Sequence, residues 1–308
     1  MNRTRTPVAI AIGAALFLLA ACGGGGGADP LATDSSRAAG TEDSIVVGSA
    51  DFTESALIAE IYAGALEAKG VKVKKTLNIG SREAYIPALQ DGSIDLIPEY
   101  TGVLMQYFDE SATATDSDGV YEALKAALPD GLTVLDKSAA EDKDSVTVTR
   151  ETADKYSLTS IADLKDVAGD LTLGGPPEWK TRPTGVPGLK KLYGVEFGSF
   201  RALDAGGPLT VQALKNGQVD AADLFTTDPN IPADDFVVLE DPENLFAAQN
   251  VVPLISSSKV TDTVSQTLNA VSAALDTATL TGLLAEVVND KLDEADVAAE
   301  FLTQHDLG

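Results

Sequence analysis

Short apolar runs alternate along the chain with segments whose apolar residues recur at helical spacing. Residues 44–49 are apolar and β-branched, which is typical of a strand. Thr53 is then placed to cap a helix whose apolar residues recur three and four positions apart until Gly70. Further strands are predicted at residues 71–79, 94–97, 146–149, 171–173, 200–203, 221–225 and 236–239, with helices at 82–90 and through 261–307. This order predicts an α/β fold with largely parallel sheets.

The first 21 residues have the pattern of a signal peptide. Arg3 and Arg5 precede an uncharged run, residues 8–21, that is shorter than a membrane-spanning helix. The run ends in Leu-Ala-Ala-Cys22, which resembles the lipobox of bacterial lipoproteins, where the cysteine is acylated and becomes the mature N-terminus. Cys22 is the only cysteine, so an internal disulfide is excluded. We expect export and a lipid anchor on Cys22 at the extracytoplasmic side of the cell membrane.

Residues 22–42 predict a flexible tether between that anchor and the folded body. They begin with five consecutive glycines and continue with small and polar residues, which bury too little apolar surface to fold. The remaining residues, 43–308, are numerous enough to bury the cores of two lobes.

The acidic composition excludes some classes of partner and of chemistry. The chain has 22 basic and 47 acidic residues, a net charge of −25, which repels nucleic acids and favours the approach of cations. His305 is the only histidine and lies near the C-terminus. The sequence therefore offers no Cys/His metal cluster and no Ser/His/Asp triad, and we expect no metal, no cofactor and no enzyme activity.

Three parts of the sequence resemble the glycine betaine/choline/carnitine-type substrate-binding proteins of ABC importers. They are VGSADFTE (47–54), GSRE (80–83) with IDLIPEYTG (94–102), and PE through RPTGVPGL (177–189) with GQVD (217–220) and FTTD (225–228). The resemblance implies a two-lobed periplasmic-binding fold of type II with the ligand in a cleft between the lobes. One lobe is expected to comprise residues 43–145 and 250–308, and the other residues 146–249.

Ligands of that family set a definite chemical requirement. A quaternary ammonium has no N–H, so it is held by aromatic faces, each contributing about 0.5–2 kcal/mol. A ligand carboxylate suits an arginine fork. Both belong where strands end at a crevice. The resemblance and these positions together imply the ligand-binding residues Asp51, Phe52, Thr53, Tyr100, Thr101, Arg182, Phe225, Thr226, Gln249 and Asn250.

The sequence departs from the family's box of four aromatic residues. It keeps Tyr100 and Phe225, but has Asp144-Ser145 at the third place and Gln249-Asn250 at the fourth. Two missing rings remove about 1–4 kcal/mol of cation–π attraction. Amide groups suit hydroxyls and carbonyls instead. A quaternary amine and a polyol or other hydroxylated metabolite therefore both stay open as ligands.

The expected mechanism is closure of the lobes around the solute. Contacts from both lobes favour the closed form, which a monomeric binding protein delivers to the permease and, through it, to the ATPase of the importer. A lipoprotein that senses the ligand without feeding a transporter is the alternative. Neighbouring permease and ATPase genes distinguish transport from sensing.

Overall fold

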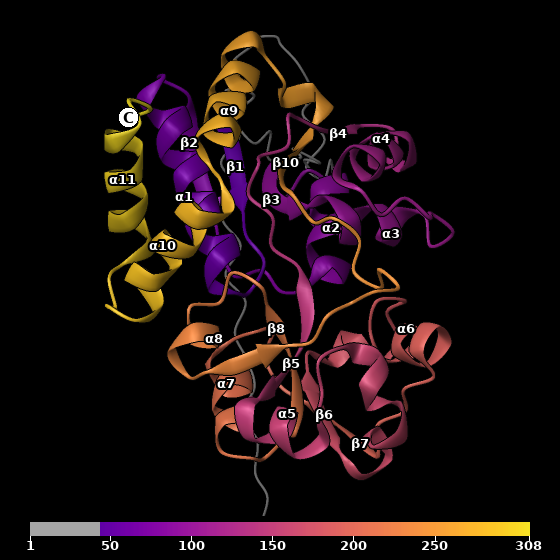
Figure 1. Ribbon diagram of the computed structural model, residues 1–308. Helices are drawn as coiled ribbons and strands as arrows, with labels where there is room; N and C mark the ends of the chain where they lie inside the picture. The colour runs from indigo at the N-terminus through magenta and orange to yellow at the C-terminus, as the bar shows by residue number, and fades with distance from the viewer. Residues whose placement is uncertain (1–43) are drawn as a thin grey trace, which may run out of the picture. The chain divides into compact units, whose positions relative to one another are not determined.

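Two five-stranded sheets organise residues 44–308, the part of the chain that the computed structural model describes (Figure 1). The expected signal peptide, the lipidated Cys22 and the tether lie outside the described residues. The first sheet has the order β2 (Lys72–Thr76), β1 (Ser44–Gly48), β3 (Leu96–Tyr100), β10 (Val251–Ser256), β4 (Leu132–Val134). The second has the order β7 (Ser199–Ala202), β6 (Thr172–Gly175), β8 (Ala221–Phe225), β5 (Asp144–Thr149), β9 (Phe236–Val238).

The sheets are mixed, which corrects the expectation of largely parallel sheets. In the first sheet β1 is parallel to β2 and β3, whereas β10 is antiparallel to β3 and β4. In the second, β6 is parallel to β7 and β8, whereas β5 is antiparallel to β8 and β9. The antiparallel strands β5 and β10 are the first strands after each passage of the chain from one sheet to the other. The periodicity of apolar residues in the sequence does not indicate whether a strand runs parallel or antiparallel to its neighbours.

Helices cover both faces of the first sheet. They are α1 (Thr53–Ala68), α2 (Arg82–Gln90), α3 (Thr101–Phe108), α4 (Ser117–Ala127), α9 (Asp262–Ala274), α10 (Thr277–Val288) and α11 (Glu294–Gln304). Alternate residues of β10 serve the two faces: Val251 and Ile255 pack with α1 and the C-terminal helices, and Val252 and Leu254 pack with α2 to α4. We call this sheet with its helices the first lobe.

The second sheet carries α5 (Arg150–Tyr156), α6 (Val186–Gly188), α7 (Pro208–Lys215) and α8 (Asn230–Ala233). Here too the strands divide their side chains between two clusters. Val146 and Ala221 pack with the buried Trp179, and Ala222 and Leu224 pack with α7. We call this sheet with its helices the second lobe. Two α/β halves thus confirm the predicted fold class.

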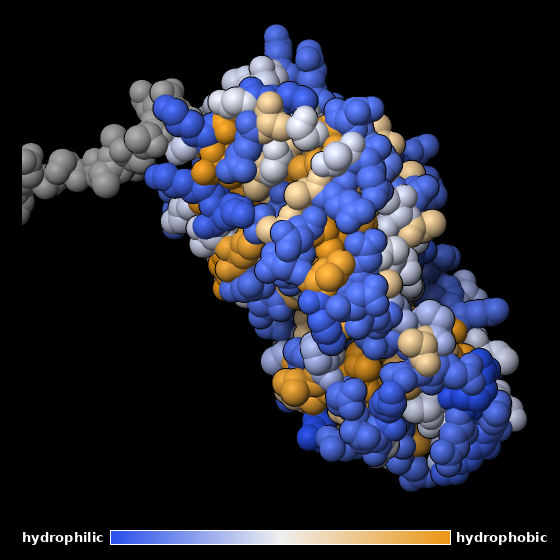
Figure 2. Space-filling model, turned by 90° about the vertical axis from the view of Figure 1, so that its left-hand side faces the viewer, coloured by the Kyte–Doolittle hydropathy of each residue, from blue (hydrophilic) through white to orange (hydrophobic). Residues whose placement is uncertain are grey.

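The surface of the described residues is mainly polar. Hydrophilic residues cover most of the face shown in Figure 2, and apolar residues reach it in small separate areas. Within residues 44–308, no single helix has the length and apolar character of a membrane span, and only α9 and α10 together, bent by 88°, pass that test.

Candidate functional site

A cavity of about 250 Å³ lies between the lobes. We call it the main cavity. Side chains from both lobes line it: Ala50, Asp51, Phe52, Ser81, Arg82, Tyr85, Tyr100, Val103, Asp142, Asp144, Pro176, Pro177, Glu178, Arg182, Leu203, Asp204, Ala205, Asp223, Phe225 and Gln249. Its lining combines aromatic rings, two guanidinium groups and several carboxyl groups.

Three aromatic rings gather at this cavity from three different elements. Phe52 precedes α1, Tyr100 ends β3 and Phe225 ends β8. The ring centroids of Phe52 and Tyr100 are 6.0 Å apart, and those of Phe52 and Phe225 are 5.0 Å apart. Phe52 and Tyr100 belong to the first lobe and Phe225 to the second, so the ring cluster spans the lobe boundary.

Arg82 and Glu99 form a buried ion pair at the wall of the cavity. The Arg82 Nε and Nη2 atoms donate to the two carboxylate oxygens of Glu99 at 2.7 and 2.8 Å, and the hydroxyl of Tyr85 donates to the same carboxylate at 2.7 Å. Burial alone lowers the pKa of a guanidinium, but the charges of Glu99 and Tyr85 and the hydrogen bonds to Glu99 together outweigh burial and raise the pKa of Arg82 above its usual value. Glu99 therefore neutralises the buried cation.

Arg182 joins the lobes at the edge of the cavity. Its Nε and Nη2 atoms donate to the carboxylate of Glu83, at 3.2 and 2.9 Å. Partial burial acts to raise the pKa of Glu83, but hydrogen bonds from Arg182 and Ser81 lower it to about 2. This fork is the group in the cavity lining that suits a ligand carboxylate, and here it is held by a protein carboxylate.

Three carboxyl groups of the lining are held in surroundings that favour their protonated form. Burial raises the pKa of Asp142, and the charge of Glu54 raises it further. Burial also raises the pKa of Asp144 and of Asp223, and the charge of Arg182 opposes it in both cases. A cation placed among these three groups would favour their ionised form.

Glu54 links the two lobes through buried hydrogen bonds. Its carboxylate accepts from the hydroxyl of Tyr100 at 2.7 Å and from the hydroxyl of Thr227, in the second lobe, at 2.6 Å. The backbone N–H of Thr227 also donates to Asp142, at 3.1 Å. Burial raises the pKa of Glu54, although the hydrogen bonds from Thr227 and Tyr100 act in the opposite direction.

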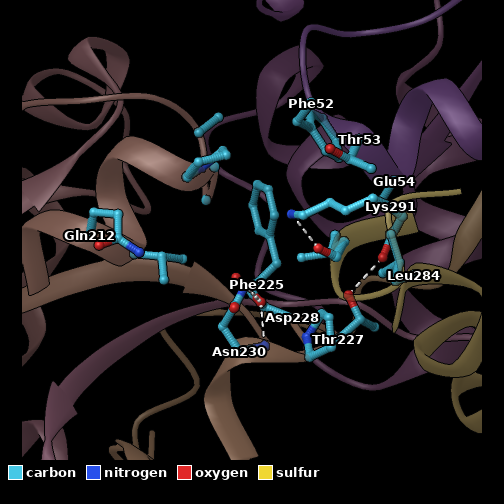
Figure 3. A pocket seen from close by; sticks show the side chains of 17 residues that line it. Phe52, Thr53, Glu54, Gln212, Phe225, Thr227, Asp228, Asn230, Leu284 and Lys291 are labelled. Carbon is cyan, nitrogen blue, oxygen red and sulfur yellow. Dashed lines mark hydrogen bonds between the residues drawn. The ribbon is translucent and has the colours of Figure 1, made fainter. Parts of the chain in front are cut away.

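A second cavity, of about 170 Å³, shares Phe52 and Phe225 with the main cavity (Figure 3). Figure 3 shows Phe225 in its centre, Phe52 above and to the right of the Phe225 ring, and Lys291 reaching towards that ring from the right. The Nζ atom of Lys291 donates to the carbonyl of Val288 at 2.6 Å. Phe52 and Phe225 therefore line both cavities of the inter-lobe region.

The sequence profile of a known family spans this whole architecture. Residues 43–304 match the family described as the substrate-binding domain of ABC-type glycine betaine transport systems. The chain belongs to this family. It is thus an extracytoplasmic solute-binding protein of an ABC importer and belongs to a family of non-enzymatic proteins.

Individual relatives match this chain over most of their own length. The glycine betaine-binding protein YehZ of Escherichia coli is 29% identical over 84% of this chain and 90% of its own. The carnitine transport binding protein OpuCC of Listeria monocytogenes is 27% identical over 86% of this chain and 88% of its own. The resemblance found in the sequence is therefore confirmed.

Solved structures share the fold. A glycine betaine/carnitine/choline ABC transporter structure is 26% identical, with a TM-score of 0.68 over 85% of this chain and 99% of that one. Lactococcal OpuAC, closed on glycine betaine, is 13% identical, with a TM-score of 0.61 over 86% of this chain and 96% of that one. The fold is the two-lobed type II periplasmic-binding fold, as the sequence predicts.

The structure of this binding protein brings together six of the ten residues expected to bind ligand. The six that line the main cavity are Asp51, Phe52, Tyr100, Arg182, Phe225 and Gln249. Thr53 lines the second cavity instead. Ala50 and Val103 also line the main cavity.

The other three residues lie outside the lining of both cavities. The hydroxyl of Thr101 is completely buried, donates to the carbonyl of Ala248 and accepts from the N–H of Asn250. The side chain of Asn250 is engaged by Ser117 and Ser138 within the first lobe. Thr226 is exposed, and its hydroxyl accepts from the N–H of Lys143. The side chains of these three residues therefore make hydrogen bonds within the protein.

Several residues that line the main cavity are not among those that the sequence predicts. Arg82 and Tyr85 lie in the first turn of α2, and both line the cavity. Asp223 had a visible signal, because it interrupts the apolar strand Ala-Ala-Asp-Leu-Phe two positions before Phe225, on the same face of the strand. Asp142 gave no such signal, since it lies in an irregular segment.

Proposed function

We propose that this protein captures a small osmoprotectant-type solute with a quaternary ammonium group, such as glycine betaine, choline or carnitine, and delivers it to its permease. The observation that carries the proposal is the cluster of Phe52, Tyr100 and Phe225, which reaches one cavity from both lobes. Ring faces are the protein groups that hold a methylated ammonium, because it has no N–H to donate.

The charges around the rings support a cationic guest. Asp142, Asp144 and Asp223 all line the cavity, and the buried guanidinium of Arg82 is already neutralised by Glu99. The Coulomb attraction of a carboxylate for an ammonium is strengthened where water is excluded. For a zwitterionic solute, Arg182 is the group that would receive the ligand carboxylate, in exchange for Glu83.

A hydroxylated solute without methylated nitrogen is the second candidate. The observation that favours it is Gln249, whose amide donates to Asp144 at 3.3 Å and lines the cavity where a ring would serve a quaternary amine. Amide and carboxyl groups together bind hydroxyl groups well. A polyol is the simplest solute of this kind.

Delivery would follow from closure of the lobes. Ring contacts and the Arg182–Glu83 ion pair join the lobes in this structure, and a solute that touches both lobes would favour the same form. We further propose that Cys22 carries a lipid that holds the protein beside its permease. Replacing it, Cys22→Ser, should move the protein from the membrane fraction to the soluble fraction of cells; retention in the membrane contradicts the anchor.

Calorimetric titration of the purified protein tests the ligand class. Glycine betaine, choline and carnitine should bind with micromolar or tighter dissociation constants, and glycerol and sorbitol should not. Tyr100→Ala should weaken the binding of each ammonium solute, whereas Tyr107→Ala, a ring on the surface of α3, should leave it unchanged. Binding of the polyols alone would support the second candidate, and an unaffected Tyr100→Ala variant would contradict the ring site.

A further inference from the structure

A strand of the second lobe places a carboxyl group with no protein partner at the main cavity. Asp223 lies in the middle of β8, is completely buried and lines that cavity. Within residues 44–308, neither of its side-chain oxygens has a hydrogen bond of good geometry, although the backbone N–H of Ser145 is near enough to lower its pKa. Its neighbours Ala222 and Leu224 pack with α7, so the two-residue repeat of a strand puts Asp223 on the same face as Phe225.

The surroundings of Asp223 do not compensate its burial. Buried polar groups are normally hydrogen-bonded, because burial removes their hydration. Burial and the nearby Asp144 raise the pKa of Asp223 by more than Arg182, which is already paired with Glu83, and the backbone N–H of Ser145 lower it. An unpartnered acceptor therefore stands at the cavity wall, at a strand position whose neighbours are all apolar.

This acceptor distinguishes between solutes that the rings alone treat alike. A quaternary ammonium is attracted to a carboxylate by charge but has no hydrogen to donate, whereas a hydroxyl or a protonated amine has one. We propose that Asp223 is a ligand-binding residue that accepts a hydrogen bond from the solute. The preferred solute then carries a hydroxyl or N–H group beside the ammonium centre that the rings hold. This inference rests on the proposed function and narrows its ligand class.

Three pairs of solutes that differ by one donor hydrogen test the inference. They are carnitine and 4-(trimethylammonio)butanoate, choline and its O-methyl ether, and N,N-dimethylglycine and glycine betaine. In titrations of the purified protein, the member with the donor should bind roughly tenfold tighter or more in each pair. Choline and carnitine donate through oxygen and dimethylglycine through nitrogen, so the pairs also show which donor is preferred.

Two variants locate the effect at Asp223. In Asp223→Ala the difference within each pair should shrink to about twofold or less. Asp51→Asn removes a carboxylate from the exposed rim of the same cavity and should change both members of a pair alike. The melting temperature of ligand-free Asp223→Asn should equal or exceed that of the wild type, because Asp223 has no hydrogen bond of good geometry to lose and the amide oxygen of Asn still faces the N–H of Ser145.

Specific results would overturn the inference. Equal affinities within all three pairs, or a difference that persists in Asp223→Ala, show that Asp223 does not accept a hydrogen bond from the solute. A lower melting temperature of ligand-free Asp223→Asn shows a structural role instead. If none of the six solutes binds, the proposed function fails and the inference with it. If all six bind and the pairs do not differ, only the inference fails.

Discussion

The rings of Phe52 and Phe225 lie 5.0 Å apart between centroids, although they belong to opposite lobes. The first precedes the long helix α1, and the second ends the central strand β8. The contact therefore joins the two lobes and also forms part of the cavity wall. Several measurable consequences follow from this and from the charged contacts around it.

Phe225→Ala should weaken the binding of a quaternary ammonium solute roughly two- to thirtyfold, which corresponds to the loss of one ring face. Phe225→Tyr keeps the face and should stay within about threefold of the wild type. Calorimetric titration with choline measures both. An Ala variant with wild-type affinity would show that the ring serves packing alone.

Glu83→Gln should strengthen the binding of solutes that carry a carboxylate. Glu83 occupies the Nε–Nη2 edge of Arg182, and the neutral amide competes less well for that edge. Glycine betaine should therefore bind a few-fold more tightly, roughly two- to tenfold. Choline, which has no carboxylate, is the matched control and should gain nothing. Equal gains for both solutes would contradict a role for Arg182 in carboxylate binding.

Glu54→Gln should change how stability depends on pH. Burial raises the pKa of Glu54, so the folded protein holds a proton that the unfolded chain releases near 4.5. The folded state then binds more protons, and this group's contribution to the free energy of unfolding falls as the pH rises above about 4.5. Relative to the wild type, the variant should become progressively more stable from pH 4.5 towards 8.

Urea denaturation across that range measures the difference. Glu67→Gln, at an exposed position of the same helix, is the control and should run parallel to the wild type. A constant offset between Glu54→Gln and the wild type at all pH values would mean that Glu54 is ionised in the folded protein as readily as in the unfolded chain.

Arg82→Met should lower the free energy of unfolding by about 3–5 kcal/mol, because it leaves the buried carboxylate of Glu99 without its cation. Arg150→Met breaks the exposed pair with Asp235 and should change the free energy of unfolding much less, because solvent screens that pair. Chemical denaturation at neutral pH compares the two. A small loss in Arg82→Met would show that Glu99 is accommodated without the ion pair.

Much of the fold was predictable because each lobe is built from strands and helices with clear periods. Predicted strands at 146–149, 171–173, 200–203 and 221–225 correspond to β5, β6, β7 and β8. The end of β3 was placed too early, at Ile97, because Pro98 and Glu99 break the apolar run although both are completely enclosed strand residues. The directions of β5 and β10 depend on where the chain changes sheets, which local pattern does not contain.

Part of the cavity lining was predictable from the family resemblance. Tyr100 and Arg182 match motif positions of that family, and both line the main cavity. The same resemblance implies Thr101 and Asn250 as ligand-binding residues, but they lie outside the cavity lining and hydrogen-bond to each other. Arg82 was missed because its partner Glu99 lies 17 positions away, and only the fold shows that they meet.

In the exchange proposed at Arg182, the ion pair with Glu83 would also limit how strongly a solute is retained. An incoming solute would gain only the difference between its own carboxylate and the one it displaces, and these are chemically the same group. Glu83 would pair with Arg182 again as the solute departs, so unloading at the permease would leave no unpaired cation behind. Moderate retention suits a carrier that must empty itself on every cycle.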